Sequence, residues 1–298
     1  MSFVEGFDVS PAYIAEMRDT MVHRGPDGAG VWVAEDRRVG LGHRRLSIID
    51  LSSSAAQPMW DCEQELVISF NGEIYNHAEL REQLIREGLT QWRTDHSDTE
   101  VVLRAFRRWG IACVQRFVGM FAFALWDQRS RELWLVRDRV GIKPLYYSHH
   151  HSRLVFASEI KALLKDPQQK RAVNEKALGH YLSFLATPAP DTLFQGIKKL
   201  APGSWLRVSS EGRMLEQAYW DPMDGVAKLD LTEEEASREL IARLRQAVEY
   251  RAVSDVPVGV FLSGGIDSST NATLFAEQVD LPVRTYSIGY DDDYSSYQ

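Results

Sequence analysis

A glycine- and hydroxyl-rich loop near the end of the chain holds the clearest potential for chemistry. Residues 259–270 read GVFLSGGIDSST, with two adjacent glycines, several hydroxyl side chains and one acid directly behind an apolar run. A turn of this kind, placed between a strand and a helix, aims backbone N–H groups and the positive end of the helix dipole at one spot. The glycines let an anion approach closely, so the loop is predicted to bind a phosphate group.

The alternative for this loop is a tight turn that needs glycine only for its backbone angles, and an isolated Gly-Gly pair favours that explanation. Here Ser263, Ser268 and Ser269 add hydroxyl donors, and Asp267 is a candidate ligand for Mg²⁺. No lysine follows the glycines, which excludes a Walker-type phosphate loop. Together these residues favour a phosphate site over a structural turn.

Three elements are predicted to position the loop. Residues 255–262 form a continuous apolar run suited to a buried parallel strand, residues 268–279 carry apolar side chains at helical spacing, and residues 281–289 predict a second strand. One such unit cannot cover both faces of a parallel sheet. We therefore expect residues after about 230 to be weakly ordered in this chain by itself.

Upstream of this unit, helix starts and β-type runs alternate. Capping signals predict four helix starts, at Ser10-Pro11, Asn76 with Glu79, Ser97 with Glu100, and Thr232 with Glu235. Strands are predicted at 65–70, 120–127, 131–138 and 153–159, and the two runs on either side of the sequence DQRSR predict a hairpin. This density of strands predicts a layered α+β domain over roughly the first two thirds of the chain.

Two local features break this alternation. Residues 218–235 lose apolar periodicity and contain Pro222 and Gly225, so a linker is predicted there. His149, His150 and His151 are consecutive, and an exposed turn between two strands explains them better than a metal site.

Composition and charge exclude several classes of protein. The 298 residues suggest two domains, and 44% hydrophobic with 26% charged residues is typical of an ordinary globular protein. The net charge of −8 argues against nucleic acid and anionic membranes as partners. Cys62 and Cys113 lack the spacing of a zinc site and are expected to be free thiols. No run is long enough to span a bilayer and no signal peptide opens the chain, so we expect a cytoplasmic protein.

The string SGGIDSS resembles the pyrophosphate loop of ATP pyrophosphatases, enzymes that cleave ATP between the α and β phosphates and adenylate a carboxylate or carbonyl group. The resemblance implies ATP and Mg²⁺ as cofactors. It places the pyrophosphate on Ser263, Gly264, Gly265, Asp267, Ser268 and Ser269, with Asp267 as the candidate metal ligand, and the adenine beside Leu262 and Ile288.

Seven earlier motifs, in order, resemble the glutaminase domain of glutamine-hydrolysing asparagine synthetases. They are HRGPDG (23–28), GHRRLSIIDL (42–51), FNGEIYN (70–76), SDTE (97–100), GMFAFALWD (119–127), RDRVGIKPLYY (137–147) and ASEIKALL (157–164). The resemblance runs from about residue 10 to the last residue. It implies a four-layer αββα glutaminase domain of the N-terminal-nucleophile type over 1–218, a linker over 219–232, and the start of a Rossmann-like α/β ATP-pyrophosphatase domain over 233–298.

The residue types in these motifs suit glutamine as the substrate. Arg45 can bind its α-carboxylate through two charge-assisted hydrogen bonds, and Asp98 can accept from its α-ammonium. The side chain of Asn71 and the N–H of Gly72 can form an oxyanion hole, worth about 3 to 4 kcal/mol per donor in comparable sites. The pocket implied by the resemblance is lined by Arg45, Leu46, Ser47, Ile48, Ile49, Asn71, Gly72, Glu73 and Asp98.

Each of these residues also has a purely structural explanation. Asp98, in the first turn of a predicted helix, could merely complement the helix dipole, and Arg45 could be a surface arginine. Asn71-Gly72 could be a type I′ hairpin turn. Their joint appearance in the order that the resemblance requires favours the glutamine site.

Glutaminases of this family use an amino-terminal cysteine whose thiol attacks the amide while its α-amine handles the proton. This chain opens MSFVEGFD, and Cys62 and Cys113 are internal, so neither has a free α-amine. Ser2 could become terminal, but an alcohol is the poorer nucleophile, and a displaced or damaged start is the favoured explanation. We therefore expect no glutaminase turnover from the chain as written.

The resemblance implies an asparagine synthetase that hydrolyses glutamine and uses ATP and the released ammonia to convert aspartate into asparagine, through a β-aspartyl adenylate, with AMP and pyrophosphate as products. In that family the chain continues after the sequence YSIGYDDDYSSYQ through most of the synthetase domain, so this sequence resembles a partial copy. The alternatives are a related amidoligase with another carboxylate acceptor, or a non-catalytic glutamine-binding remnant. A homodimer is left open.

Overall fold

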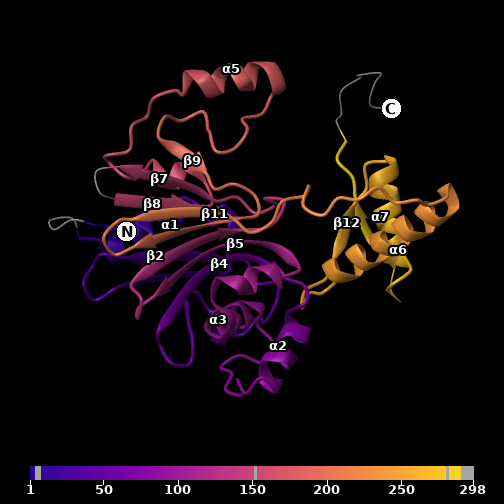
Figure 1. Ribbon diagram of the computed structural model, residues 1–298, viewed down its shortest axis with the longest axis horizontal. Helices are drawn as coiled ribbons and strands as arrows, with labels where there is room; N and C mark the ends of the chain where they lie inside the picture. Colours follow the sequence, from indigo (N-terminus) through magenta and orange to yellow (C-terminus); the bar gives the residue numbers. More distant parts are fainter. Residues whose placement is uncertain (4–7, 151–152, 280–281, 290–298) are drawn as a thin grey trace. The chain divides into compact units, whose positions relative to one another are not determined.

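A computed structural model describes residues 1–3, 8–150, 153–279 and 282–289 of the chain. The chain divides into two compact units, Met1–Asp224 and Gly225–Gln298 (Figure 1). The division falls inside the stretch predicted as a linker, while the individual domain boundaries at 218 and 233 stay predictions. No helix within the described part of the chain is long and apolar enough to cross a membrane.

The first unit is built on one large antiparallel sheet and two smaller ones. The six strands of the large sheet lie in the order β11-β10-β6-β5-β4-β3. Their bounds are β3 Met59–Trp60, β4 Leu66–Ile74, β5 Gly119–Asp127, β6 Glu132–Arg137, β10 Ser204–Ser209 and β11 Met214–Ala218. The smaller sheets are the pair β1 Gly28–Val33 and β2 Gly40–Arg45, and the triplet β8 Arg153–Ala157, β7 Tyr146–His150 and β9 Ile197–Lys199.

Helices cover the outer faces of these sheets. On the large sheet lie α2 His77–Arg86 and α3 Asp98–Trp109 (Figure 1). On the smaller sheets lie α1 Pro11–Asp19, against β2, and α4 Ile160–Leu163, against β8. Helix α5, Glu175–Phe184, follows, and short 3-10 turns lie at η1 Val22–Arg24, η2 Ser53–Ala55 and η3 Gly110–Gln115.

Three hydrophobic clusters lie between the resulting four layers. The first joins α2 and α3 to the large sheet, the second lies between the sheets, and the third lies under α1 and α4. Neighbouring residues of β4 show the division, because Ile68 belongs to the first cluster and Val67 to the second. Successive side chains of a strand point to opposite faces, so β4 supplies both cores. The predicted αββα architecture is confirmed.

Two of the four predicted helix caps form as expected. The Ser10 side chain accepts from the N–H of Tyr13 at 3.1 Å, and Thr232 and Glu235 form a reciprocal capping box.

The prediction that Asn76 and Ser97 cap their helices through side-chain hydrogen bonds is wrong. The helices begin at the next residue in each case, but neither side chain makes a cap hydrogen bond. The Asn76 Oδ1 atom accepts from the N–H of Val118 at 2.9 Å, and Glu100 accepts from the N–H of Thr94 at 2.7 Å. Asn76 and Glu100 thus accept hydrogen bonds from neighbouring segments, whose N–H groups need partners, and not from the first turn of their own helix.

All four strands predicted for the first unit are present, with ends that differ by one or more residues. β5 and β6 form the predicted hairpin, with Asp127 opposite Glu132. β4 runs four residues beyond the predicted end, to Ile74, so it includes the sequence NGEI. His149 and His150 close β7, while His151 lies outside the described residues.

The second unit, taken by itself, has the predicted strand–loop–helix–strand order after a long helix. Its elements are α6 Glu233–Arg251, β12 Gly259–Phe261, α7 Ile266–Ala276 and β13 Arg284–Tyr286. The two strands pair in parallel, with Val260 opposite Thr285. Among the described residues of this unit only Leu274 and Phe275 are buried apolar side chains, so its core is small.

This small core predicts unequal stability of the two units. Amide hydrogens of α6 and α7 should exchange about 100-fold or more faster than those of β5, whose inner residues are buried, because local opening costs little where few apolar contacts are lost. Hydrogen exchange followed by mass spectrometry on the whole chain measures both at once. Equal protection of α7 and β5 would contradict this expectation.

Candidate functional site

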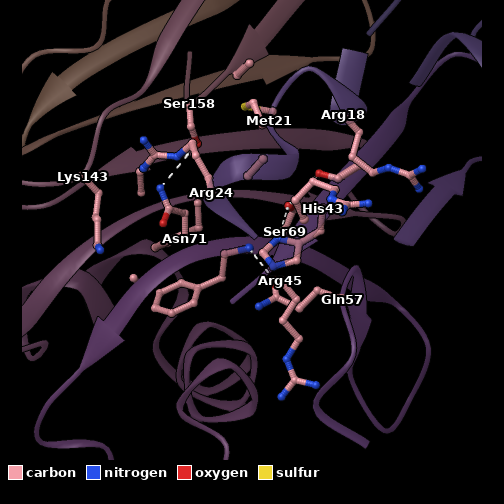
Figure 2. A pocket seen from close by; sticks show the side chains of 18 of the residues that line it. Arg18, Met21, Arg24, His43, Arg45, Gln57, Ser69, Asn71, Lys143 and Ser158 are labelled. Atoms are coloured by element: carbon pink, nitrogen blue, oxygen red, sulfur yellow. Dashed lines mark hydrogen bonds between the residues drawn. The ribbon is translucent and has the colours of Figure 1, made fainter. Parts of the chain in front are cut away.

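A cavity of about 550 Å³ lies in the first unit where β2, β4 and β8 approach one another (Figure 2). Eight of the nine residues predicted for a glutamine pocket line it: Arg45, Leu46, Ile48, Ile49, Asn71, Gly72, Glu73 and Asp98. The ninth, Ser47, is not among the lining residues, and its N–H donates to Asp27 Oδ2 at 2.8 Å. The structure thus brings together side chains from three segments that are far apart in the sequence.

Asn71 and Gly72 lie within β4 and not in a turn, so the hairpin explanation for Asn-Gly is wrong. Asn71 is opposite Ala122 and Gly72 is opposite Phe121 on β5. A Cβ atom on Gly72 would lie 2.2 Å from the carbonyl oxygen of Met120 and 2.7 Å from Cα of Phe121. Glycine is required here because the β5 backbone comes too close for a side chain.

The hydrogen bonds of Phe121 decide where the Gly72 N–H points. The N–H of Phe121 donates to Asp138 Oδ2 at 3.2 Å, and its carbonyl accepts from the N–H of Asp138 at 2.8 Å. Gly72 and Phe121 are therefore a non-hydrogen-bonded pair of the antiparallel ladder, and the Gly72 N–H points away from β5.

Alternate residues of β4 present their N–H groups to the same edge. The N–H of Phe70 donates to Gln57 Oε1 at 2.6 Å, and that of Ile74 donates to Asp98 Oδ2 at 3.0 Å. The Gly72 N–H lies between them on this edge, in the wall of the cavity. Asn71 donates through Nδ2 to Ser158 Oγ at 3.4 Å, which leaves a second N–H on the same nitrogen. Backbone and side-chain donors are thus present side by side, as an oxyanion hole requires.

Asp98 is buried, with 5% of its surface exposed, at the first position of α3. Burial, together with the charge of Glu73, raises the pKa of its carboxyl group to about 7, against the hydrogen bonds from Ile74 and Thr99. A solvent-exposed acid that merely complements the helix dipole would not be enclosed in this way. The location suits a carboxylate whose partner is a bound cation.

Arg45 ends β2 and is half-buried, so it is not a free surface arginine. Its guanidinium donates to the carbonyl of Ser52 at 2.9 Å and also to the carbonyl of Asp50. These two hydrogen bonds use two of the five N–H groups of the guanidinium. They tie Arg45 to the end of the loop that carries Ile48 and Ile49, which line the cavity. Its role in binding a ligand carboxylate stays a prediction.

The cavity is also lined by residues to which the sequence interpretation gave no role, among them His43, Gln57, Lys143 and Ser158. His43 Nδ1 lies 3.3 Å from Ser69 Oγ, and burial together with the charge of Arg45 lowers the pKa of His43 to about 4, so its ring is neutral. Burial lowers the pKa of Lys143, against the charge of Glu73. Three of the four lie inside motifs used for the resemblance, but each comes from a different segment, and only folding brings them together.

The amino terminus lies away from the oxyanion residues. The Met1 amine donates to the carbonyl of Leu154 at 2.7 Å, and burial lowers the pKa of this amine to about 5. Ser2 is buried opposite Arg153. Arg153 precedes Ser158 by five positions, a separation of roughly 16 Å along an extended strand. The structure therefore does not bring Ser2 to Asn71.

Neither cysteine replaces a terminal nucleophile at this site. Both are free thiols, as predicted, and neither is among the residues that line the cavity. Burial raises the pKa of both thiols, and Cys113 lies within the core under α3.

The predicted phosphate loop of the second unit is held by its own hydroxyl groups. Ser263 Oγ lies 3.0 Å from Ser268 Oγ, and the N–H of Ser263 donates to Ser268 Oγ at 3.2 Å. Gly264 has φ of +83° with no atom within 4 Å of the position of an added Cβ, and Gly265 is the N-cap of α7. The loop thus leaves open space at a helix N-terminus, which fits a phosphate group. Leu262 is half-buried and Ile288 is 80% exposed.

The first unit matches the family model described as "Glutamine amidotransferase domain" over residues 3–220, and residues 239–298 match the model described as "Asparagine synthase". The chain therefore belongs to the glutamine amidotransferase domain family. It has the class II, N-terminal-nucleophile type of fold, followed by a short asparagine synthase region.

Among curated relatives, the glutamine-hydrolyzing asparagine synthetase 1 of Bacillus subtilis is 38% identical over 278 residues, which cover 93% of this chain and 43% of the relative. The amidase chry2 of Gibberella zeae is 37% identical over 263 residues, which cover 88% of this chain and 38% of the relative. This chain thus spans less than half the length of both relatives.

Among solved structures, a glutamine phosphoribosylpyrophosphate amidotransferase from B. subtilis aligns with a TM-score of 0.54 at 18% identity, over 98% of this chain and 67% of that one. This likeness concerns the fold alone.

The close contact at Gly72 predicts a strong effect of substitution there. Gly72→Ala should destabilise the first unit by about 1 to 3 kcal/mol or more, because the added Cβ meets backbone atoms of β5 that can move only if the strands separate. Gly179→Ala, in α5 with open space around it, is the matched control and should be neutral or stabilising by up to about 1 kcal/mol. Urea unfolding followed by tryptophan fluorescence reports the first unit alone, because all eight tryptophans lie in it.

The pKa of Asp98 predicts how stability changes with pH. Its folded-state pKa of about 7 exceeds the ordinary value of 3.8 for an aspartate, so the folded chain binds more protons between these values and loses stability as pH rises from about 4 to about 7. Asp98→Asn mimics the protonated acid, so it should match the wild type near pH 4 and exceed it by on the order of 3 kcal/mol at pH 8. A difference that does not change with pH in the same fluorescence assay would show that Asp98 titrates normally.

Proposed function

We propose that the first unit binds glutamine in the cavity beside β4, and that the whole protein uses the amide nitrogen of glutamine to convert aspartate into asparagine at the expense of ATP. One observation carries this proposal: a backbone donor at Gly72, an amide donor at Asn71 and the buried carboxyl group of Asp98 lie together along one edge of β4. The names and identities of the relatives support the choice of reaction.

Each side chain has a part that follows from its position. Asp98 would hold the α-ammonium of glutamine, and a bound cation would lower its pKa and make it a carboxylate. Arg45 would hold the α-carboxylate with the N–H groups not used by the loop. Asn71 and Gly72 would donate to the side-chain carbonyl oxygen as it gains negative charge, after which water and the amide yield glutamate and ammonia.

The second unit would supply the energy for the transfer. ATP, when bound, activates the acceptor carboxylate by adenylation and leaves as AMP and pyrophosphate. The open loop from Ser263 to Ser269 would hold the pyrophosphate through backbone N–H and hydroxyl groups. Asp267, in the first turn of α7, would be a ligand of Mg²⁺.

Two alternative functions differ from this one in a single feature. Another carboxylate could be the acceptor, since nothing in the described residues selects aspartate. A glutamine-binding protein without catalysis is favoured by one observation, the placement of Ser2 beside Arg153 and not beside Asn71. We also propose a cytoplasmic location, which the free Cys62 and Cys113 support.

Binding of glutamine tests the proposal directly. The chain should bind L-glutamine in isothermal titration calorimetry, and Asp98→Asn should weaken binding about 10- to 100-fold, because a charge-assisted hydrogen bond to the ammonium is lost. Asp95→Asn is the matched control, since the Asp95 side chain is 98% exposed three residues away, and it should bind as the wild type does. The proposal is wrong if the wild-type chain binds no glutamine, or if both variants lose affinity equally.

A further inference from the structure

Ser158 lies immediately after the last residue of β8 and contacts Asn71 at the wall of the cavity (Figure 2). We propose that Ser158 is a positioning residue that fixes the orientation of the Asn71 side-chain amide, and that an ion-pair cluster centred on Glu159 holds Ser158 in place. The inference rests on the proposed function, because the orientation of Asn71 has a consequence only when a carbonyl oxygen binds beside it.

The two ends of an asparagine amide have almost the same shape but opposite polarity. The NH₂ group stabilises a developing oxyanion, whereas a flipped amide would present lone pairs to it and repel it. Ser158 Oγ accepts from Nδ2 of Asn71 at 3.4 Å, which uses one N–H and leaves the other for a ligand. In this arrangement the amide nitrogen lies on the side of the cavity that carries Ser158.

Lys143 is a further neighbour of this part of the cavity. Figure 2 shows the Asn71 amide between Ser158 and Lys143, with its nitrogen toward Ser158. Lys143 is half-buried and lines the same cavity.

The position of Ser158 is itself held from both directions along the chain. Ala157, the residue before it, pairs with Tyr146 in β7. Glu159, the residue after it, accepts from His23 Nε2 at 2.9 Å and from Arg24 Nη1 at 3.3 Å through one oxygen, and from Lys161 Nζ at 3.0 Å through the other. The backbone of Ser158 is therefore held on both sides, in the position from which its hydroxyl group contacts Asn71.

The charges of the cluster support this anchoring role. Burial opposes ionisation of Glu159, but its hydrogen bonds with Lys161, His23 and Arg24 hold the pKa of this carboxyl group below its usual value. The side chain of Glu159 is 22% exposed, whereas that of His23 is 54% exposed. The better enclosed carboxylate is thus the centre of the cluster, and it links η1 to the start of α4.

Two ligands separate an effect on Asn71 from a general loosening of the site. L-Glutamine carries the side-chain carbonyl that Asn71 would contact, while L-norvaline has the same zwitterionic head and no amide. By calorimetry, Ser158→Ala should weaken L-glutamine binding about three- to tenfold and leave L-norvaline unchanged, and Glu159→Gln should give a smaller loss of the same kind. Ser158→Thr, which keeps the hydroxyl group, should bind both ligands within twofold of the wild type. Ser183→Ala, at an exposed serine of α5, is the control and should change neither.

The Asn71 amide can also be followed by nuclear magnetic resonance. Its side-chain ¹⁵N–¹H₂ signals, assigned by their loss in Asn71→Asp, should shift when L-glutamine saturates the wild type and should shift much less in Ser158→Ala. Equal losses for both ligands, or the same Asn71 shift in Ser158→Ala as in the wild type, would overturn the role of Ser158 while glutamine binding stands. A wild-type chain that binds no glutamine overturns the proposed function and this inference with it.

Discussion

The edge of β4 beyond Ile68 is the feature on which the site depends. β3 pairs with β4 only at Val67 and Ile68, so the N–H groups farther along need other partners. Side chains of Gln57 and Asp98 accept from Phe70 and Ile74, and the Gly72 N–H between them lies in the cavity wall. Because β3 is short, N–H groups of β4 are satisfied by side chains from other segments, and the Gly72 N–H lies in the wall of a cavity.

Asp98 shows how stability and function oppose each other at this edge. Its burial raises the cost of its negative charge, which is why its pKa is raised, and the same burial strengthens its attraction for a bound ammonium group. An amide in its place would satisfy Ile74 without that cost but would hold a cation poorly. Under the proposed function, the ammonium group of glutamine would explain why a carboxyl group and not an amide stands at this position.

The two units differ in how their sites are organised. The cavity of the first unit gathers residues from β2, β4 and β8 around a double-layered core, whereas the loop of the second unit is one continuous segment that hydrogen-bonds to itself. Local sequence is enough to shape a loop of that kind. The cavity exists only when the sheets are assembled, so its geometry depends on the stability of the whole first unit.

The sequence by itself determined the elements and the class of site. The density of strands predicted a layered α+β domain, and the family resemblance of the motifs implied its αββα layers and a pocket shared by Arg45, Asn71, Gly72 and Asp98. The glycines of the second unit predicted its loop. The tertiary structure alone decided that Asn71-Gly72 lies in a strand, that the N–H of Ser47 donates to Asp27, and that Ser158 contacts Asn71. The physical reason is that capping and periodicity act over a few residues, whereas strand register and side-chain pairing join segments that only the folded chain brings together.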